Sequence, residues 1–145
     1  MKKTSLLLII LIILLLTPAL DAKNSPQWEK KENIYLFKVH INDDIVVNTD
    51  HYLTTFKSSA GYLLPLQQFC DLLKLGIEVN PAGGTAKGFI ISEEREFSLK
   101  MAAQSIQVDG KGYSFNGDNV KANSRDIYID HHTLEKLLPI KIEIK

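Results

Sequence analysis

Cysteine is almost absent from this chain, since Cys70 is the only one among 145 residues. A single cysteine excludes an intrachain disulfide, so the fold must be held together by its apolar core. Leu66, Phe69, Cys70 and Leu73 recur with the spacing of one helix face. This pattern predicts that Cys70 packs inside the protein as a small apolar side chain and is not exposed as a reactive thiol.

An excess of positive charge is also missing, because 17 Lys and Arg residues balance 17 Asp and Glu residues. The chain therefore lacks the basic surplus typical of nucleic-acid-binding domains and the polybasic cluster that favours an anionic membrane surface. It has no G-x-S-x-G sequence, and the glycine-rich stretch at 83–88 lacks the spacing of a phosphate-binding loop. We expect no nucleic-acid partner, no serine-hydrolase motif and no nucleotide cofactor.

Histidines, the commonest metal ligands, are few. They are His40, His51 and the adjacent pair His131 and His132. Neighbouring side chains on a helix point about 100° apart, whereas a zinc pair on one helix needs the i, i+4 spacing. We therefore expect no metal and no other cofactor, and we expect the adjacent pair to lie at a solvated helix start.

One long hydrophobic run is present, at the N-terminus. Lys2 and Lys3 precede eleven consecutive Leu and Ile residues at 6–16, and small residues follow at 17–22. This order is typical of a secretory signal peptide, and the run is shorter than the roughly 20 residues of a membrane-spanning helix. We expect residues 1–22 to be a signal peptide and the protein to be periplasmic or extracellular, with no other membrane segment. The alternative is an N-terminal anchor that is not cleaved.

The remaining chain predicts a polar leader at 23–33 and one domain at 34–145. Apolar and polar residues alternate as in strands, and two segments show the helical period. Gly76 is expected to end the first helix in a left-handed conformation, and Asp130 to cap the second. Hairpin turns are expected at Glu93-Glu94 and Asp109-Gly110, and a polar loop at 116–124. The strands are expected at 34–41, 45–47, 52–56, 77–79, 86–91, 97–101, 104–108, 113–115, 127–129 and 140–144, and the helices at 65–75 and 133–138.

Two segments of the domain repeat each other at a spacing of 65 residues: GYLLPLQQFCDLLKLGIEV at 61–79 and DIYIDHHTLEKLLPIKIEI at 126–144. Eight positions match in type without a gap, including Leu64 with Ile129 and Leu73 with Leu138. Self-similarity at a fixed spacing indicates a repeated structural unit. The sequence thus predicts an α+β fold, a mostly antiparallel sheet with two short helices, built as two related strand–helix–strand halves at about 35–80 and 104–144.

Two family resemblances follow from these residues. Leu64-Pro65-Leu66, the leucine-rich helix and Leu75-Gly76-Ile77 resemble the stalk-type domain named after the N-terminal region of copper amine oxidases. The polar turns in HINDDIVV and IQVDGKGYSF fit the same pattern, although Asp130 replaces its proline and Lys141 its glycine in the second half. This resemblance covers about 35–144 and implies a non-catalytic accessory domain outside the cytoplasm, without copper. The segment GTAKGFIISEEREFSLKM is similar to N-terminal segments of usher-like proteins that assemble surface fibres in Gram-negative bacteria.

Three functions are compatible with the sequence. The first is an exported, non-catalytic protein-interaction or scaffold module of the bacterial envelope, such as one for surface-fibre assembly. Its candidate surface for binding an envelope protein or a glycan consists of Tyr52, Tyr62, Phe89 and Tyr113. The second is an envelope hydrolase, or an inhibitor of one, which predicts a cleft that joins Asp43, Glu78 or Glu93 with a histidine. The third is a purely structural spacer. We favour the first, and therefore expect no enzyme and no catalytic residues.

Overall fold

The computed structural model describes residues 28, 32–41, 44–47 and 52–144. The predicted signal peptide and most of the predicted leader lie outside these residues. The chain divides into two compact units, Met1–Lys30 and Lys31–Lys145, and the fold below is that of the second unit. In the part of the chain that the structure describes, no helix combines the length and the apolar character that a membrane crossing requires.

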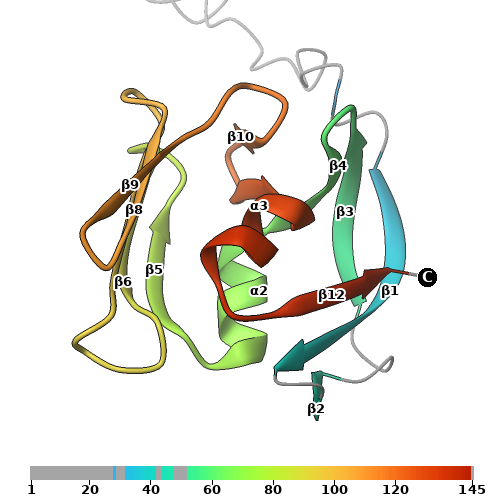
Figure 1. Cartoon of the computed structure of the whole chain (residues 1–145). Coiled ribbons are helices and arrows are strands. Elements are labelled where there is room, and N and C mark those ends of the chain that lie inside the picture. The colour runs from blue at the N-terminus through green and yellow to red at the C-terminus, as the bar shows by residue number, and fades with distance from the viewer. Residues whose placement is uncertain (1–27, 29–31, 42–43, 48–51, 145) are drawn as a thin grey trace, which may run out of the picture. The chain divides into compact units, whose positions relative to one another are not determined.

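Two antiparallel sheets and two helices make up the domain, with α2 (Leu66–Leu73) and α3 (His131–Leu137) lying between the sheets (Figure 1). One sheet has seven strands in the order β10-β11-β4-β3-β1-β12, with β2 added to β1. Its strands are β1 (Glu32–Ile41), β2 (Asp44–Val47), β3 (Tyr52–Ser58), β4 (Gly61–Pro65), β10 (Val120–Ala122), β11 (Ile127–Asp130) and β12 (Lys141–Ile144). The α+β prediction is therefore confirmed.

The second sheet is a five-stranded meander in which each strand pairs with the next along the chain. Asp109 and Gly110 form its last turn with φ angles of 51° and 76°, the left-handed geometry of a two-residue hairpin turn. That turn confirms the prediction made for this dipeptide. The strands are β5 (Gly76–Asn80), β6 (Thr85–Phe89), β7 (Glu96–Lys100), β8 (Ser105–Val108) and β9 (Lys111–Ser114).

A single apolar core joins both sheets and both helices. Cys70 lies within it and is fully buried, as predicted. Burial, reinforced by the negative charges of Asp126 and Asp71, raises the pKa of its thiol to about 12. The thiol therefore stays protonated near neutral pH and serves as packing.

The two halves of the repeat meet through β4 and β11. These strands pair antiparallel with Leu64 opposite Ile129, which are equivalent positions of the two copies. The hairpins that contain them also match, because the pair Lys57 and Tyr62 corresponds to the pair Ala122 and Ile127. An approximate two-fold axis therefore passes between Leu64 and Ile129. The copies diverge after their helices, since β5 begins the meander and β12 joins β1.

Asp126, in the second copy, forms hydrogen bonds with the start of α2 in the first copy. Its carboxylate accepts hydrogen bonds from the backbone N–H of Gln67 at 3.1 and 3.2 Å, so it caps the first turn of α2. It also accepts the N–H of Ile127 at 2.7 Å. Burial raises the pKa of Asp126, and these backbone hydrogen bonds counteract that shift. The cap comes from the partner copy because Pro65, at the N-cap position of α2, forms no side-chain cap.

His131 fills the two-fold counterpart of this position. Residue 61, the equivalent of Asp126, is a glycine, and a Cβ atom there would lie 2.6 Å from Cε1 of His131. The imidazole Nδ1 accepts the backbone N–H of Tyr62 at 3.2 Å, so this nitrogen is unprotonated. Burial and the adjacent His132 lower the pKa of His131, against the opposing effect of Glu135 and Asp130. The predicted solvated helix start thus holds only for His132, which is exposed.

The end of α2, the predicted loop at 116–124 and the start of α3 differ from the prediction. Lys74, and not Gly76, takes the left-handed conformation that ends α2, with φ 55°. The N–H of Leu75 bonds to the carbonyl of Cys70 at 2.9 Å, which closes the helix before the glycine is reached. The predicted loop at 116–124 contains the short strand β10. Asp130 caps α3 as predicted by accepting the N–H of Thr133 at 3.1 Å, although this helix starts at His131.

Replacement of Asp126 by alanine should test the cap between the copies. Asp126→Ala leaves the N–H groups of Gln67 and Ile127 without their acceptor, so we expect a loss of about 1–3 kcal/mol in the free energy of unfolding. Urea unfolding followed by circular dichroism measures this change. Asp118→Ala is the matched control, because Asp118 is exposed, and it should change stability by less than about 0.5 kcal/mol. Equal effects of the two substitutions would contradict the cap.

The lowered pKa of His131 predicts a pH dependence of stability. A histidine that is harder to protonate in the folded than in the unfolded chain contributes stability above its ordinary pKa of about 6.5 and loses it as the pH falls through the lowered value. The free energy of unfolding should therefore fall with acidification below about pH 6.5. NMR titration should show the His131 ring titrating below this pH. A titration of His131 above pH 6.5 would contradict the assignment.

Candidate functional site

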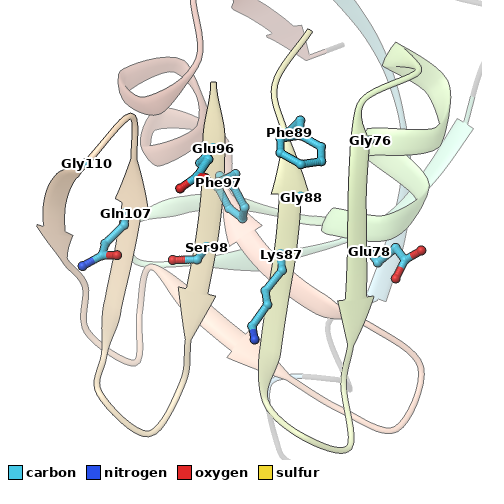
Figure 2. Close-up of a pocket in the computed structure, with 10 residues that line it drawn as sticks. All are labelled: Gly76, Glu78, Lys87, Gly88, Phe89, Glu96, Phe97, Ser98, Gln107 and Gly110. Carbon is cyan, nitrogen blue, oxygen red and sulfur yellow. The ribbon is translucent and has the colours of Figure 1, made fainter. Parts of the chain in front are cut away.

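The outer face of the five-stranded sheet carries an open groove of about 520 Å³ (Figure 2). This volume lies within the range of small-molecule and peptide sites. Strands β5 to β8 and the β8–β9 turn contribute its walls, and the helices pack on the other face of the sheet (Figure 1). Its lining residues are Gly76, Glu78, Lys87, Gly88, Phe89, Glu96, Phe97, Ser98, Gln107 and Gly110.

Position 88, which lines the groove, can be occupied only by glycine. Gly88 has φ 151°, a conformation that other residues rarely adopt. A Cβ atom at this position would lie 1.9 Å from the carbonyl oxygen of Gly76, so no side chain fits. The backbones of β5 and β6 can approach each other here only because residue 88 is glycine.

One row of polar side chains crosses the groove. Glu78, Lys87, Ser98 and Gln107 are successive partners on β5, β6, β7 and β8, so they lie side by side on one face. Together they offer a carboxylate acceptor, an ammonium donor, and a hydroxyl and an amide that can both donate and accept. This set can bind polar groups of either kind along an extended ligand.

Two exposed apolar side chains lie at and just after the end of β6. Phe89, at the end of β6, is 40% exposed, and Ile91, two residues later, is 68% exposed. The N–H of Ser92 bonds to the carbonyl of Ile90 at 2.7 Å, which makes Ile91 the centre of a γ-turn with φ 67°. This turn is rare, and a β-branched residue in it is strained. Strain that holds an apolar side chain outward is a feature often associated with function. Phe89 lines the groove, and Ile91 lines a small neighbouring cavity; we call these two residues the apolar rim.

A small apolar cavity of about 50 Å³ adjoins the rim beneath Ile91. It lies where the ends of both helices meet, since Leu73 and Leu75 of the first copy face their equivalents Leu138 and Ile140 of the second. This cavity is much smaller than the sites that bind substrates or cofactors. It extends the apolar surface that surrounds Ile91.

The candidate aromatic residues from the sequence lie at separate places. Phe89 lines the groove, whereas Tyr113 lies on β9, with Nζ of Lys136 5.8 Å from its ring centroid. Tyr62 is half-buried in β4, and its ring meets His131 edge-on with 5.7 Å between centroids. Tyr52 begins β3, but its side chain lies outside the described part of the structure. Of the three whose side chains are described, Phe89 alone lines the groove. Ile91 could not be predicted as a site residue, because a left-handed isoleucine has no sequence signal.

The residues of the hydrolase hypothesis are spread over the domain. Glu78 lines the groove, Glu93 lies in the exposed turn between β6 and β7, and Asp43 is outside the described residues. None of the described residues that line the groove is a histidine. His40 lies instead on β1, with Nε2 3.4 Å from the carboxylate of Glu143.

The histidine pair His131 and His132 was the most plausible place for a metal ion in the sequence. The rings of His131 and His132 lie 3.8 Å apart between centroids, and the side chain of His132 also approaches Glu135 at 3.5 Å. Over the described ranges, no three His, Cys, Asp or Glu side chains gather as a metal ion would require.

Comparisons with protein-family models, with curated proteins and with solved structures each returned no match to this chain. The site must therefore be interpreted from its own geometry.

Proposed function

We propose that this protein is an exported, non-catalytic interaction module of the bacterial envelope, and that its groove binds an extended segment of a partner protein. The main support is the exposed Phe89, which lines the groove beside a row of polar side chains and is followed two residues later by the exposed Ile91. Interfaces commonly combine a few exposed apolar anchors with polar groups that fix orientation. A polypeptide supplies both kinds of complementary group.

The chemistry of the domain supports binding rather than catalysis. Among the residues that the structure describes, the side chains with a shifted pKa are Cys70, Asp126 and His131, and all of them lie in the core or between the two copies. None of them lines the groove. Groups tuned for acid–base chemistry are expected to face a cleft.

Export is the part of the proposal that rests on the N-terminal sequence. If residues 1–22 are a signal peptide, the mature protein should begin near Lys23 and be recovered from the periplasm or the medium. N-terminal sequencing and fractionation of the native host measure both. Recovery of the full-length chain in the cytoplasm would contradict export, and recovery of the full-length chain in the membrane fraction would indicate the uncleaved anchor.

Binding at the groove can be tested by replacing Phe89 with a photo-crosslinking phenylalanine analogue in the host cell. We expect a discrete adduct from position 89 and none from position 118, which is exposed but lies outside the groove. Once the partner is identified, Phe89→Ala should weaken its binding about thirtyfold, since a central aromatic anchor contributes about 2 kcal/mol. A glycan partner would instead give no protein adduct and would show binding on a glycan array that Phe89→Ala abolishes.

Ile91→Gly separates binding from folding in the same assay. Glycine adopts the left-handed conformation without strain, so this variant should be at least as stable as the original chain. We expect it to lose binding all the same, because the rim loses an anchor. Unchanged binding in both Phe89→Ala and Ile91→Gly would contradict a role for the groove and would favour a spacer.

A further inference from the structure

We infer that the free edge of β9 is a second interaction surface, which adds an extended acidic segment of a partner protein as a sixth strand of the meander. This surface is separate from the groove, because residues 111–114 are not among its lining residues. The inference does not rest on the groove function proposed above.

The backbone pattern shows which groups are free. The two-residue turn at Asp109 and Gly110 makes Val108 and Lys111 a hydrogen-bonded pair, and bonded pairs then alternate along the hairpin. The bond from the N–H of Phe115 to the carbonyl of Gln104, 3.0 Å long, continues this alternation. It follows that the N–H and C=O groups of Gly112 and Ser114 point away from the sheet.

Two other edge strands of the domain, β5 and β12, each donate a backbone hydrogen bond to a helix side chain. The N–H of Val79 on β5 donates to Oε1 of Gln67 on α2 at 2.9 Å. The N–H of Ile142 on β12 donates likewise to Oε1 of Glu135 on α3 at 2.8 Å. Proteins commonly block exposed strand edges in this way, because an open edge recruits another strand.

The edge of β9 has no such closure within the described residues. Gly112 and Ser114 are exposed, and a Cβ atom at Gly112 would find no atom within 4 Å. No described side chain hydrogen-bonds to the outward N–H and C=O groups of Gly112 and Ser114, so these groups are available to another strand. Strand addition of this kind uses main-chain hydrogen bonds for affinity and side chains for specificity.

Charge selects the partner. Lys111 lies on β9 itself, and Nζ of Lys136 lies over the ring of Tyr113 at 5.8 Å. Both lysines are exposed, and neither forms an ion pair with another described residue. The nearby carboxylate of Asp109 is already held by Arg95 at 3.0 Å. The edge is therefore positive, which favours a strand with acidic side chains. A second copy of this chain would instead bring lysines towards lysines.

The test uses a synthetic nine-residue peptide that alternates valine and glutamate, with a valine–lysine peptide as its counterpart. We expect the acidic peptide to bind the purified chain at least tenfold more tightly than the basic one in a calorimetric titration. Its binding should shift the amide NMR signals of Gly112 and Ser114. Equal binding of the two peptides, or no binding of the acidic one, would overturn the charge argument.

Ser114→Pro is the decisive variant, with Ser114→Ala as its matched control. Proline removes only an outward N–H, so the pairing of β9 with β8 should survive, and edge strands tolerate proline. We expect Ser114→Pro to weaken the acidic peptide at least tenfold and Ser114→Ala to change it less than twofold. If Ser114→Pro fails to fold, the double variant Lys111→Glu, Lys136→Glu serves instead, and it should prefer the basic peptide.

Two results would overturn the inference. One is acidic-peptide binding that persists in Ser114→Pro. The other is a dimer of the original chain, seen by light scattering, that Ser114→Pro dissociates, because the edge would then be occupied by a second copy. Loss of peptide binding in Ser114→Pro with an unchanged crosslink from position 89 would separate this edge from the groove.

Discussion

The antiparallel pairing of β4 with β11 is the contact on which the rest of the domain depends. It joins equivalent strands of the two copies, and all four residues of β11 are buried. A slip by one residue would turn Leu64 and Ile129 to opposite faces of the sheet. The register in turn places Asp126 at the start of α2 and His131 beside Tyr62. The position of both helices thus follows from one strand pair.

The two copies share this seam but not their surroundings. After α2 the chain enters β5 and builds the meander, whereas after α3 it enters β12 and returns to β1. The first copy therefore leads to a sheet whose outer face and last edge are open. The shifted ionisable groups remain at the seam and in the core, where they serve structure. The groove lies on the outer face of the meander, and β9 lies at its end.

Much of the fold could be predicted because local pattern and burial agree. The period of Leu66, Phe69 and Cys70 identified the buried face of α2, and Asp109-Gly110 specified its hairpin turn. The repeat predicted two similar units, but a spacing of 65 residues carries no information on which strands pair. Lys74 was missed because a helix can close on any residue that completes the hydrogen bonds of its last turn. β10 was missed because its three residues sit among Asn, Asp and Gly.

The candidate site was less predictable than the fold. Phe89 was one of four aromatic residues on predicted strands that were named as surface candidates. Nothing in the sequence distinguished the exposed Phe89 from the half-buried Tyr62. The polar row that crosses the groove joins residues up to 29 positions apart, from Glu78 to Gln107, and depends on three strand registers. The edge of β9 is free because no described helix side chain bonds to its backbone, in contrast to β5 and β12. Such features belong to the assembled sheets and not to any single segment.

The pairing of β1 with β12 has a consequence for how the protein reaches its final form. Phe37 lies opposite Ile144, so the first strand of the domain is completed by the last. Contacts this distant in the chain form slowly, because a long loop must close before they are gained. A chain made from its N-terminus therefore has β1 without this partner until β12 has been synthesised. The native sheet can close only once both strands are present, and until then this part of β1 is an open edge that can pair with another chain.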